Sequence, residues 1–212
     1  MSKLVHRYGP KVAWPLVALC ILILIAFAVL RAAQTYGFSP TPERLFELRY
    51  LDHPIISAVH MASGIAFVLF APLQFIKRLR NNNLGLHRGL GRVLVICALI
   101  AGSYGLVATV ALPAFGGVST ETAGWFFGTL FIFSLLRAYW CVRNKKIVLH
   151  REWMIRAFAM GLAVGTQRLL LLILVPTTGQ SFEAVFGSCL WLGFSINLLI
   201  AEVWINVSRE RR

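Results

Sequence analysis

The sequence predicts an all-α integral membrane protein: a single bundle of transmembrane helices with both termini in the cytoplasm. Of its 212 residues, 58% are hydrophobic and only 14% are charged, which leaves no room for a sizeable water-soluble domain. The apolar residues also form long segments, separated by short clusters of Lys and Arg. Together these observations predict one membrane domain over residues 1–212, with short loops and no linker.

Six apolar segments are long enough to cross a bilayer, which takes about 20 residues at a rise of about 1.5 Å per residue. The first segment has a rival interpretation as a signal peptide, because Ala26-Phe27-Ala28 has the small-x-small form of a cleavage site. The run from Val12 to Leu30 exceeds the usual apolar region of about 7–15 residues, however, and so favours an uncleaved anchor. We expect spans at about residues 12–30, 54–76, 93–113, 124–142, 152–175 and 184–207.

Two further local features follow from proline and from apolar spacing. In the connector after the first span, Pro42 can open a helix, and the leucines from Leu45 to Leu51 suit a short amphipathic helix at the membrane surface. Pro176 is expected to end the fifth span, because proline lacks the N–H that a helix interior needs.

The orientation follows from the loop charges. The N-terminus, the 77–92 loop, the 143–151 loop and the C-terminus contain 3, 5, 4 and 3 Lys or Arg residues, respectively. The three opposite connections contain only Arg31, Arg44 and Arg49. By the positive-inside rule, both termini are therefore predicted to be cytoplasmic, with the basic loops facing anionic lipid headgroups.

Several function classes find no support in the sequence. The net charge of +13 comes from short interhelical clusters rather than from a basic stripe, so nucleic acid is not an expected partner. No P-loop, H-E-x-x-H or G-x-S-x-G motif is present, which leaves the question of an enzyme open. The four cysteines have no C-x-x-C spacing and are interpreted as small apolar residues.

A polar seam is predicted on the second span, toward the outer side. His53 and His60 are seven residues apart and therefore share a helix face, and that face continues through small residues to Gln74. Arg168, deep in the fifth span, lies at a depth similar to that of the histidines. Intramembrane ionisable residues suggest function by default, but polar residues also commonly bond a neighbouring helix.

A second, denser polar group is predicted at the cytoplasmic side, where the third and fifth spans begin and the second ends. We expect it to form one ligand-binding pocket, since these helix ends share one depth. Its candidate residues are Gln74, His87, Arg88, Arg92, His150, Trp153 and Arg156. Arg137 and Glu202 lie at comparable depths in their spans and are predicted to form an ion pair.

The fifth span also carries a stripe of small residues. Ala157, Gly161 and Gly165 repeat at four-residue spacing, which lets a neighbouring helix approach closely. This spacing predicts a helix–helix interface along that face.

Four short motifs occur in succession along the chain. An early His-Pro at residues 53–54, with His60 seven residues after His53, is followed by Pro-x-Gln-Phe at 72–75. The two histidine motifs come next, His-Arg-x-x-Gly-Arg at 87–92 and His-x-x-Trp-Met-x-Arg at 150–156. This combination resembles the signature of an uncharacterised family of bacterial integral membrane proteins, over about residues 50–175. The resemblance implies a membrane fold in the bacterial inner membrane and implies no reaction.

Three function classes remain from the residues. His87 and His150 on different helices suit axial ligation of one b-type haem, or a quinone pocket, for electron transfer. A two-haem protein is disfavoured, because His53 and His60 lie on one helix face and cannot bind opposite sides of one iron. One alternative is a small transporter, or a binder of anions or lipid headgroups, that uses Arg88, Arg92, Arg151 and Arg156 as a clamp. The other is an accessory or assembly subunit. An oligomer is compatible with each.

Overall fold

The computed structural model describes residues 2–35, 37, 53–111 and 115–209, and every regular element in these ranges is a helix. Six of these helices are long and apolar enough to cross a membrane, which confirms the predicted all-α bundle with six spans. The surface helix expected in the first connector lies outside the described residues. The helices are α1 (Ser2–Thr35), α3 (Pro54–Phe75), α4 (Lys77–Asn82), α5 (Leu84–Ala111), α6 (Val118–Arg143), α7 (Ile147–Thr178) and α8 (Phe182–Arg209).

Most of these helices extend beyond the predicted spans. Because α5 begins at Leu84 and α7 at Ile147, both histidine motifs lie in helical turns rather than in loops. The expectation that Pro176 ends its helix is wrong, since α7 continues to Thr178 and stops at Gly179, which has a left-handed backbone (φ 66°). So close to the helix end, proline removes one backbone hydrogen bond, and glycine supplies the terminating conformation.

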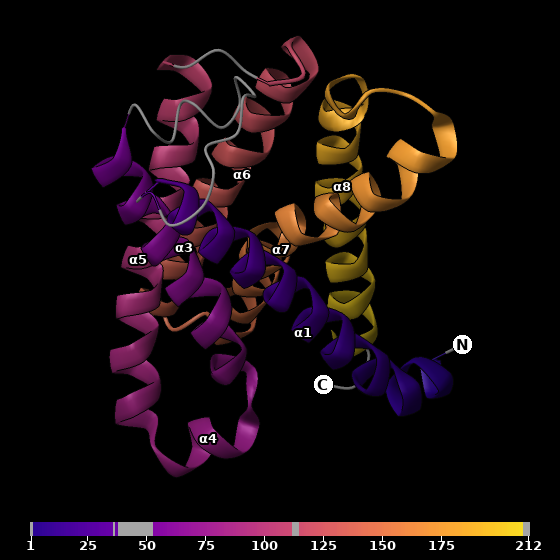
Figure 1. Cartoon of the computed structure of the whole chain (residues 1–212). Helices are drawn as coiled ribbons and strands as arrows, with labels where there is room; N and C mark the ends of the chain where they lie inside the picture. The colour runs from indigo at the N-terminus through magenta and orange to yellow at the C-terminus, as the bar shows by residue number, and fades with distance from the viewer. Residues whose placement is uncertain (1, 36, 38–52, 112–114, 210–212) are drawn as a thin grey trace.

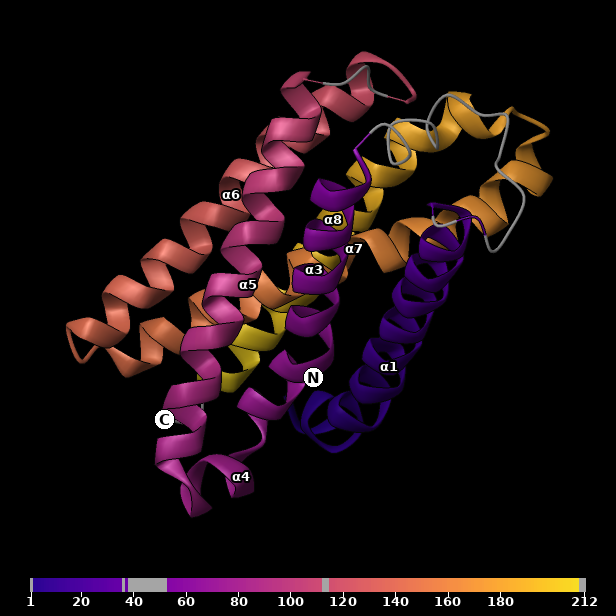
Figure 2. The same cartoon turned by 60° about the vertical axis from the view of Figure 1, so that its left-hand side comes forward.

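The helices gather in a bundle with α7 packed against α1, α3, α6 and α8. The beginning of α1, the short helix α4 and the end of α8 lie toward one end of the bundle, and the α7–α8 connection lies toward the other (Figures 1 and 2). We call these the α4 end and the opposite end. The α4 end is therefore the end that carries the basic N-terminal and 77–92 segments.

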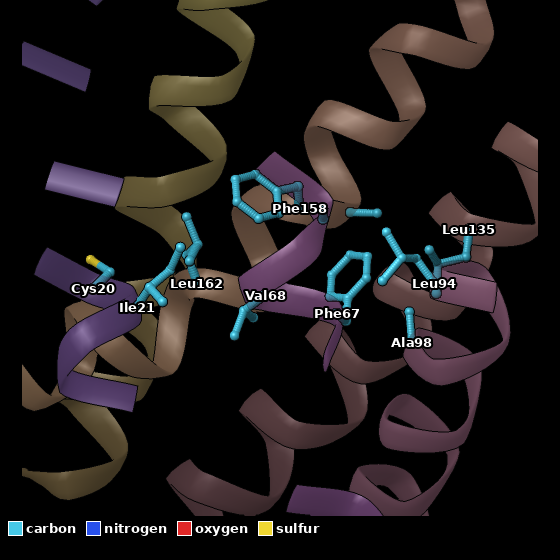
Figure 3. Close-up of a cluster of buried hydrophobic side chains, with 11 residues drawn as sticks. Cys20, Ile21, Phe67, Val68, Leu94, Ala98, Leu135, Phe158 and Leu162 are labelled. Carbon is cyan, nitrogen blue, oxygen red and sulfur yellow. The ribbon is translucent and has the colours of Figure 1, made fainter. Parts of the chain in front are cut away.

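The main core joins α1, α3, α5, α6 and α7 (Figure 3). Phe67 of α3 is buried at its centre, and its ring makes edge-on contacts with Phe131 and Phe158, with centroids 6.0 and 6.2 Å apart. Edge-to-face aromatic pairs of this kind add stability beyond their buried area.

The small-residue stripe of α7 forms the predicted interface. Ala157 is fully buried, a Cβ added at Gly161 would lie 2.9 Å from the Phe67 ring, and one added at Gly165 would lie 2.9 Å from the Cys20 carbonyl oxygen. The stripe therefore seats α3 and α1 against α7, and the prediction of close helix approach is confirmed.

Candidate functional site

The seam of α3 packs on α5. The His60 Nδ1 atom lies 3.1 Å from the Ala101 carbonyl oxygen, and its ring lies against Tyr104 with centroids 4.5 Å apart. The Tyr104 hydroxyl in turn hydrogen-bonds the hydroxyl of the fully buried Ser57 at 3.2 Å. His60 thus acts as a helix–helix contact, whereas His53 is exposed at the start of α3.

At the other end of the same face, Gln74 contacts α5 beside the first histidine motif. A Cβ placed at Gly91 would lie only 3.4 Å from the Gln74 Oε1 atom, so a larger residue at position 91 would crowd the Gln74 amide. Gly91 follows His87 by four residues, which puts both on one face of α5. Gln74 and His87 are therefore brought to the same region of the α4 end.

His87 and His150 lie near each other at this end. His87 is half-buried and within electrostatic range of Arg80, His150 and Arg88. His150 contacts α6 through its Nδ1 atom, 2.9 Å from the Ala138 carbonyl oxygen, and this bond orients the ring. Arg88 and Arg92 are exposed beside His87 on α5.

Arg156 is not a member of this group, because it binds Glu202 of α8. Its Nε and Nη2 atoms donate to Glu202 Oε1 and Oε2 at 2.5 and 2.9 Å, and its guanidinium lies 4.6 Å from the Trp153 ring centroid. A two-bond pair of this kind fixes both position and orientation. Trp153 in turn packs edge-on against Phe133 of α6, with centroids 5.4 Å apart.

The predicted partner of Glu202 is consequently corrected. Arg137 lies over the Trp140 ring of its own helix, 4.4 Å from the centroid, while Glu202 pairs with Arg156. Comparable depth is necessary for an ion pair but not sufficient, since the two side chains must also lie on facing sides of adjacent helices.

A second ion pair joins the same two helices. Arg209 donates from Nε to Glu152 Oε1 at 2.6 Å and from Nη2 to Oε2, and the Glu152 side chain is 2% exposed. Arg151 adds a bond to the Ser208 hydroxyl at 3.1 Å. The sequence holds a signal for this pair, because Glu152 and Arg209 stand about equally far from the turn that connects α7 to α8.

Two further polar features lie deeper in the bundle. Arg168 is placed against rings of α1 and α8, with its guanidinium 5.1 Å from the Phe27 centroid and 5.5 Å from that of Phe186, rather than at the α3–α5 contact of His60. Two hydrogen bonds that the sequence did not predict link α7 to α8. The Thr166 hydroxyl donates to Asn197 Oδ1 at 2.9 Å, and Asn197 Nδ2 donates to the Ala159 carbonyl oxygen at 2.9 Å. Such bonds hold helices together within a membrane.

Among the described residues, no group of three or more His, Cys, Asp or Glu side chains is arranged to hold a metal ion. This finding does not address a haem at His87 and His150, because two imidazoles are enough to ligate a haem iron.

Comparison with known protein families gives a match over most of the chain. The family model described as "Predicted membrane protein (DUF2306)" matches residues 57–205, a range that contains both histidine motifs. Neither the curated proteins nor the solved structures contain a match to the chain.

Proposed function

The chain belongs to the DUF2306 family of predicted membrane proteins, a family of unknown function, and we propose that it binds an anionic group at the α4 end of its bundle. The proposed site consists of Gln74, His87, Arg88, Arg92 and His150. Its ligand class is the phosphate of an anionic lipid headgroup.

The observation that carries this proposal is the distribution of carboxylates at the α4 end. Glu152 and Glu202 are both engaged by arginines of the α7–α8 pair, Arg209 and Arg156. No carboxylate of the described residues forms an ion pair with Arg88 or Arg92, and α4 adds three more basic residues, Lys77, Arg78 and Arg80. A basic cluster without protein counter-charge at a membrane surface attracts anionic headgroups.

The neutral members of the site add hydrogen-bonding capacity. Gln74 can donate two N–H bonds, and each neutral imidazole has one donor and one acceptor nitrogen. At His150, the Nδ1 atom is occupied by the Ala138 carbonyl, which leaves Nε2 for a ligand. Arg151 and Arg156 are left out of the predicted arginine clamp, since they bind Ser208 and Glu202 on α8.

The test compares lipids by their effect on thermal stability. In neutral detergent, phosphatidylglycerol is expected to raise the melting temperature of the protein by several degrees, because a ligand that binds only the folded state stabilises it. Phosphatidylcholine should raise it much less. The double variant Arg88→Gln/Arg92→Gln should lose at least half of the phosphatidylglycerol effect, since each arginine supplies charge and a fork of donors.

Arg137→Gln is the matched control, because it removes one basic residue that lies over Trp140 outside the site. It should keep the lipid effect. Equal stabilisation by both lipids, or an unchanged effect in the double variant, contradicts the proposal. Inorganic phosphate that reproduces the effect by itself points to a soluble anion, as expected for a small transporter, rather than to a headgroup.

Electron transfer is the second candidate, favoured by the orientation of His150 and by its position within electrostatic range of His87. Arg156, the deepest arginine of the predicted pocket and a candidate partner for a haem propionate, instead binds Glu202, which weakens this candidate. An absorption spectrum of the purified protein with and without dithionite separates the two. Anion binding alone gives no haem band, whereas a reduced b-type band replaces the proposal with a redox function.

The orientation of the bundle is part of the proposal, because it decides which lipid surface the site meets. We propose that this end faces the cytoplasm and that the bundle lies in the bacterial inner membrane, because the basic clusters of the α4 end fit the positive-inside rule. Reporter fusions after Arg212 and at Gly117, before α6, are expected to report opposite sides of the membrane, with the first cytoplasmic. Reporters on the same side, or a periplasmic C-terminus, would show that the site does not face the cytoplasmic leaflet.

A further inference from the structure

A cavity of about 350 Å³ lies toward the opposite end of the bundle, between α1, α7 and the start of α8. Its volume falls at the lower end of the range of about 300–1,000 Å³ typical of small-molecule sites. Its lining contains one charged residue, Arg168, and six apolar ones: Phe27, Leu171, Leu172, Val175, Pro176 and Phe182.

The Arg168 guanidinium is held in place at this cavity. It lies near the ring of Phe27 on α1 and the ring of Phe186 on α8, and Phe186 is buried in a cluster with Leu171. Ring contacts of this kind orient a guanidinium and leave its five in-plane N–H donors directed outward from its edge. Because it has five donors, the Arg168 guanidinium can bind a ligand and a protein acceptor at the same time.

The position of the cavity points to a ligand that arrives through the bilayer. Arg168 precedes the end of α7 at Thr178 by ten residues, or about 15 Å of helix, and so lies within the apolar span. Leu172 and Pro176, which line the cavity, are exposed on the surface of the bundle. The site therefore combines an apolar approach from the lipid side with one fixed cation.

From this geometry we propose that the cavity binds the carboxylate end of a long-chain fatty acid, independently of the site at the α4 end. One planar guanidinium matches the two oxygens of one carboxylate, and the six apolar residues contact the first part of the chain. A neutral quinone offers no negative charge to the guanidinium. A two-chain phospholipid would have to fit a bulkier headgroup than a carboxylate into a cavity of about 350 Å³.

The proposal is tested with radiolabelled oleate and the full chain in dodecyl maltoside. Saturable binding is expected, with displacement by unlabelled oleate and little displacement by oleyl alcohol, which has the same chain without the charge. Arg168→Gln should weaken binding by about tenfold or more, because the lost contact is a charge-assisted double hydrogen bond. Arg168→Lys should lose less, since it keeps the charge.

A second pair of variants tests the cavity without altering charge. Val175→Trp fills it and should abolish most oleate binding, whereas Ile173→Trp, on an exposed face of α7 outside the lining, should leave binding intact. This pair remains informative even if Arg168→Gln fails to fold. The proposal is overturned by absent saturable binding, by equal displacement with oleyl alcohol or phosphatidylglycerol, or by equal binding in the two Trp variants.

Discussion

Glu202→Gln is expected to lower the free energy of unfolding by about 2–3 kcal/mol, because it removes the carboxylate that holds Arg156 within the membrane span. The Arg156 side chain is 18% exposed, and both of its bonds to Glu202 are charge-assisted. This loss is below the range of about 3–5 kcal/mol for fully buried pairs, since Glu202 itself is 42% exposed and partly screened. The Trp153 ring remains as a weaker partner for the cation.

The measurement is the unfolding free energy in mixed micelles, compared across a double-mutant cycle. Arg156→Gln/Glu202→Gln should recover part of the loss, because it removes the stranded cation. Glu183→Gln, an exposed acid in the first turn of α8, is the matched control and should change stability by less than about 0.5 kcal/mol. A loss for Glu202→Gln no larger than that of Glu183→Gln would mean that Arg156 does not depend on the pair.

The fold was largely predictable from the sequence because a bilayer imposes one dominant constraint. Each span must be apolar over a fixed length, and helices satisfy their own backbone hydrogen bonds there. Hydropathy therefore located all six candidate spans. It located the helix ends less well, since helices such as α7 continue past the apolar segment into polar turns and past Pro176.

The pairing of side chains was less predictable, because a sequence gives the depth of a residue more readily than its direction around the helix. Depth alone suggested Arg137 for Glu202, yet α7 presents Arg156 to that carboxylate. The same limit hid the Glu152–Arg209 pair, in which Arg209 had been explained by membrane orientation alone. Counting outward from the α7–α8 turn gives the missing information, since antiparallel neighbours meet at equal distances from their turn.

The candidate site was likewise predictable in part, in its depth but not in the pairing of its side chains. The histidine motifs indicated a polar group at one end of the bundle, and the contact of Gln74 with Gly91 and the electrostatic range between His87 and His150 agree with that placement. The spacing of Arg156 from His150 did not indicate that a carboxylate on α8 would bind it, whereas its distance from the α7–α8 turn does. Arg151 and Arg156 of α7 therefore stabilise the helix pair, and the proposed ligand is assigned to Arg88 and Arg92 of α5.

A close approach of the α7 and α8 backbones predicts the other large effect, at Gly193 of α8. A Cβ at this position would lie 2.8 Å from the Ala163 carbonyl oxygen and 3.1 Å from the Gln167 backbone nitrogen, both on α7. Backbone atoms cannot move aside without shifting a helix, so Gly193→Leu should cost about 3 kcal/mol or more. At Gly161 the nearest atoms belong to the Phe67 side chain, which can shift more easily than helix backbone, so Gly161→Leu should cost less.

Gly105 of α5 completes the series, because a Cβ there has no neighbour within 4 Å. Gly105→Leu should therefore be neutral or slightly stabilising, as leucine favours helix more than glycine does. Melting temperatures in one detergent should fall in the order Gly105→Leu, Gly161→Leu, Gly193→Leu. If Gly193→Leu melts at or above the temperature of Gly105→Leu, then α7 and α8 do not approach as closely as their backbones indicate. The two ion pairs and the Thr166–Asn197 bond would then have to hold these helices together without close packing at Gly193.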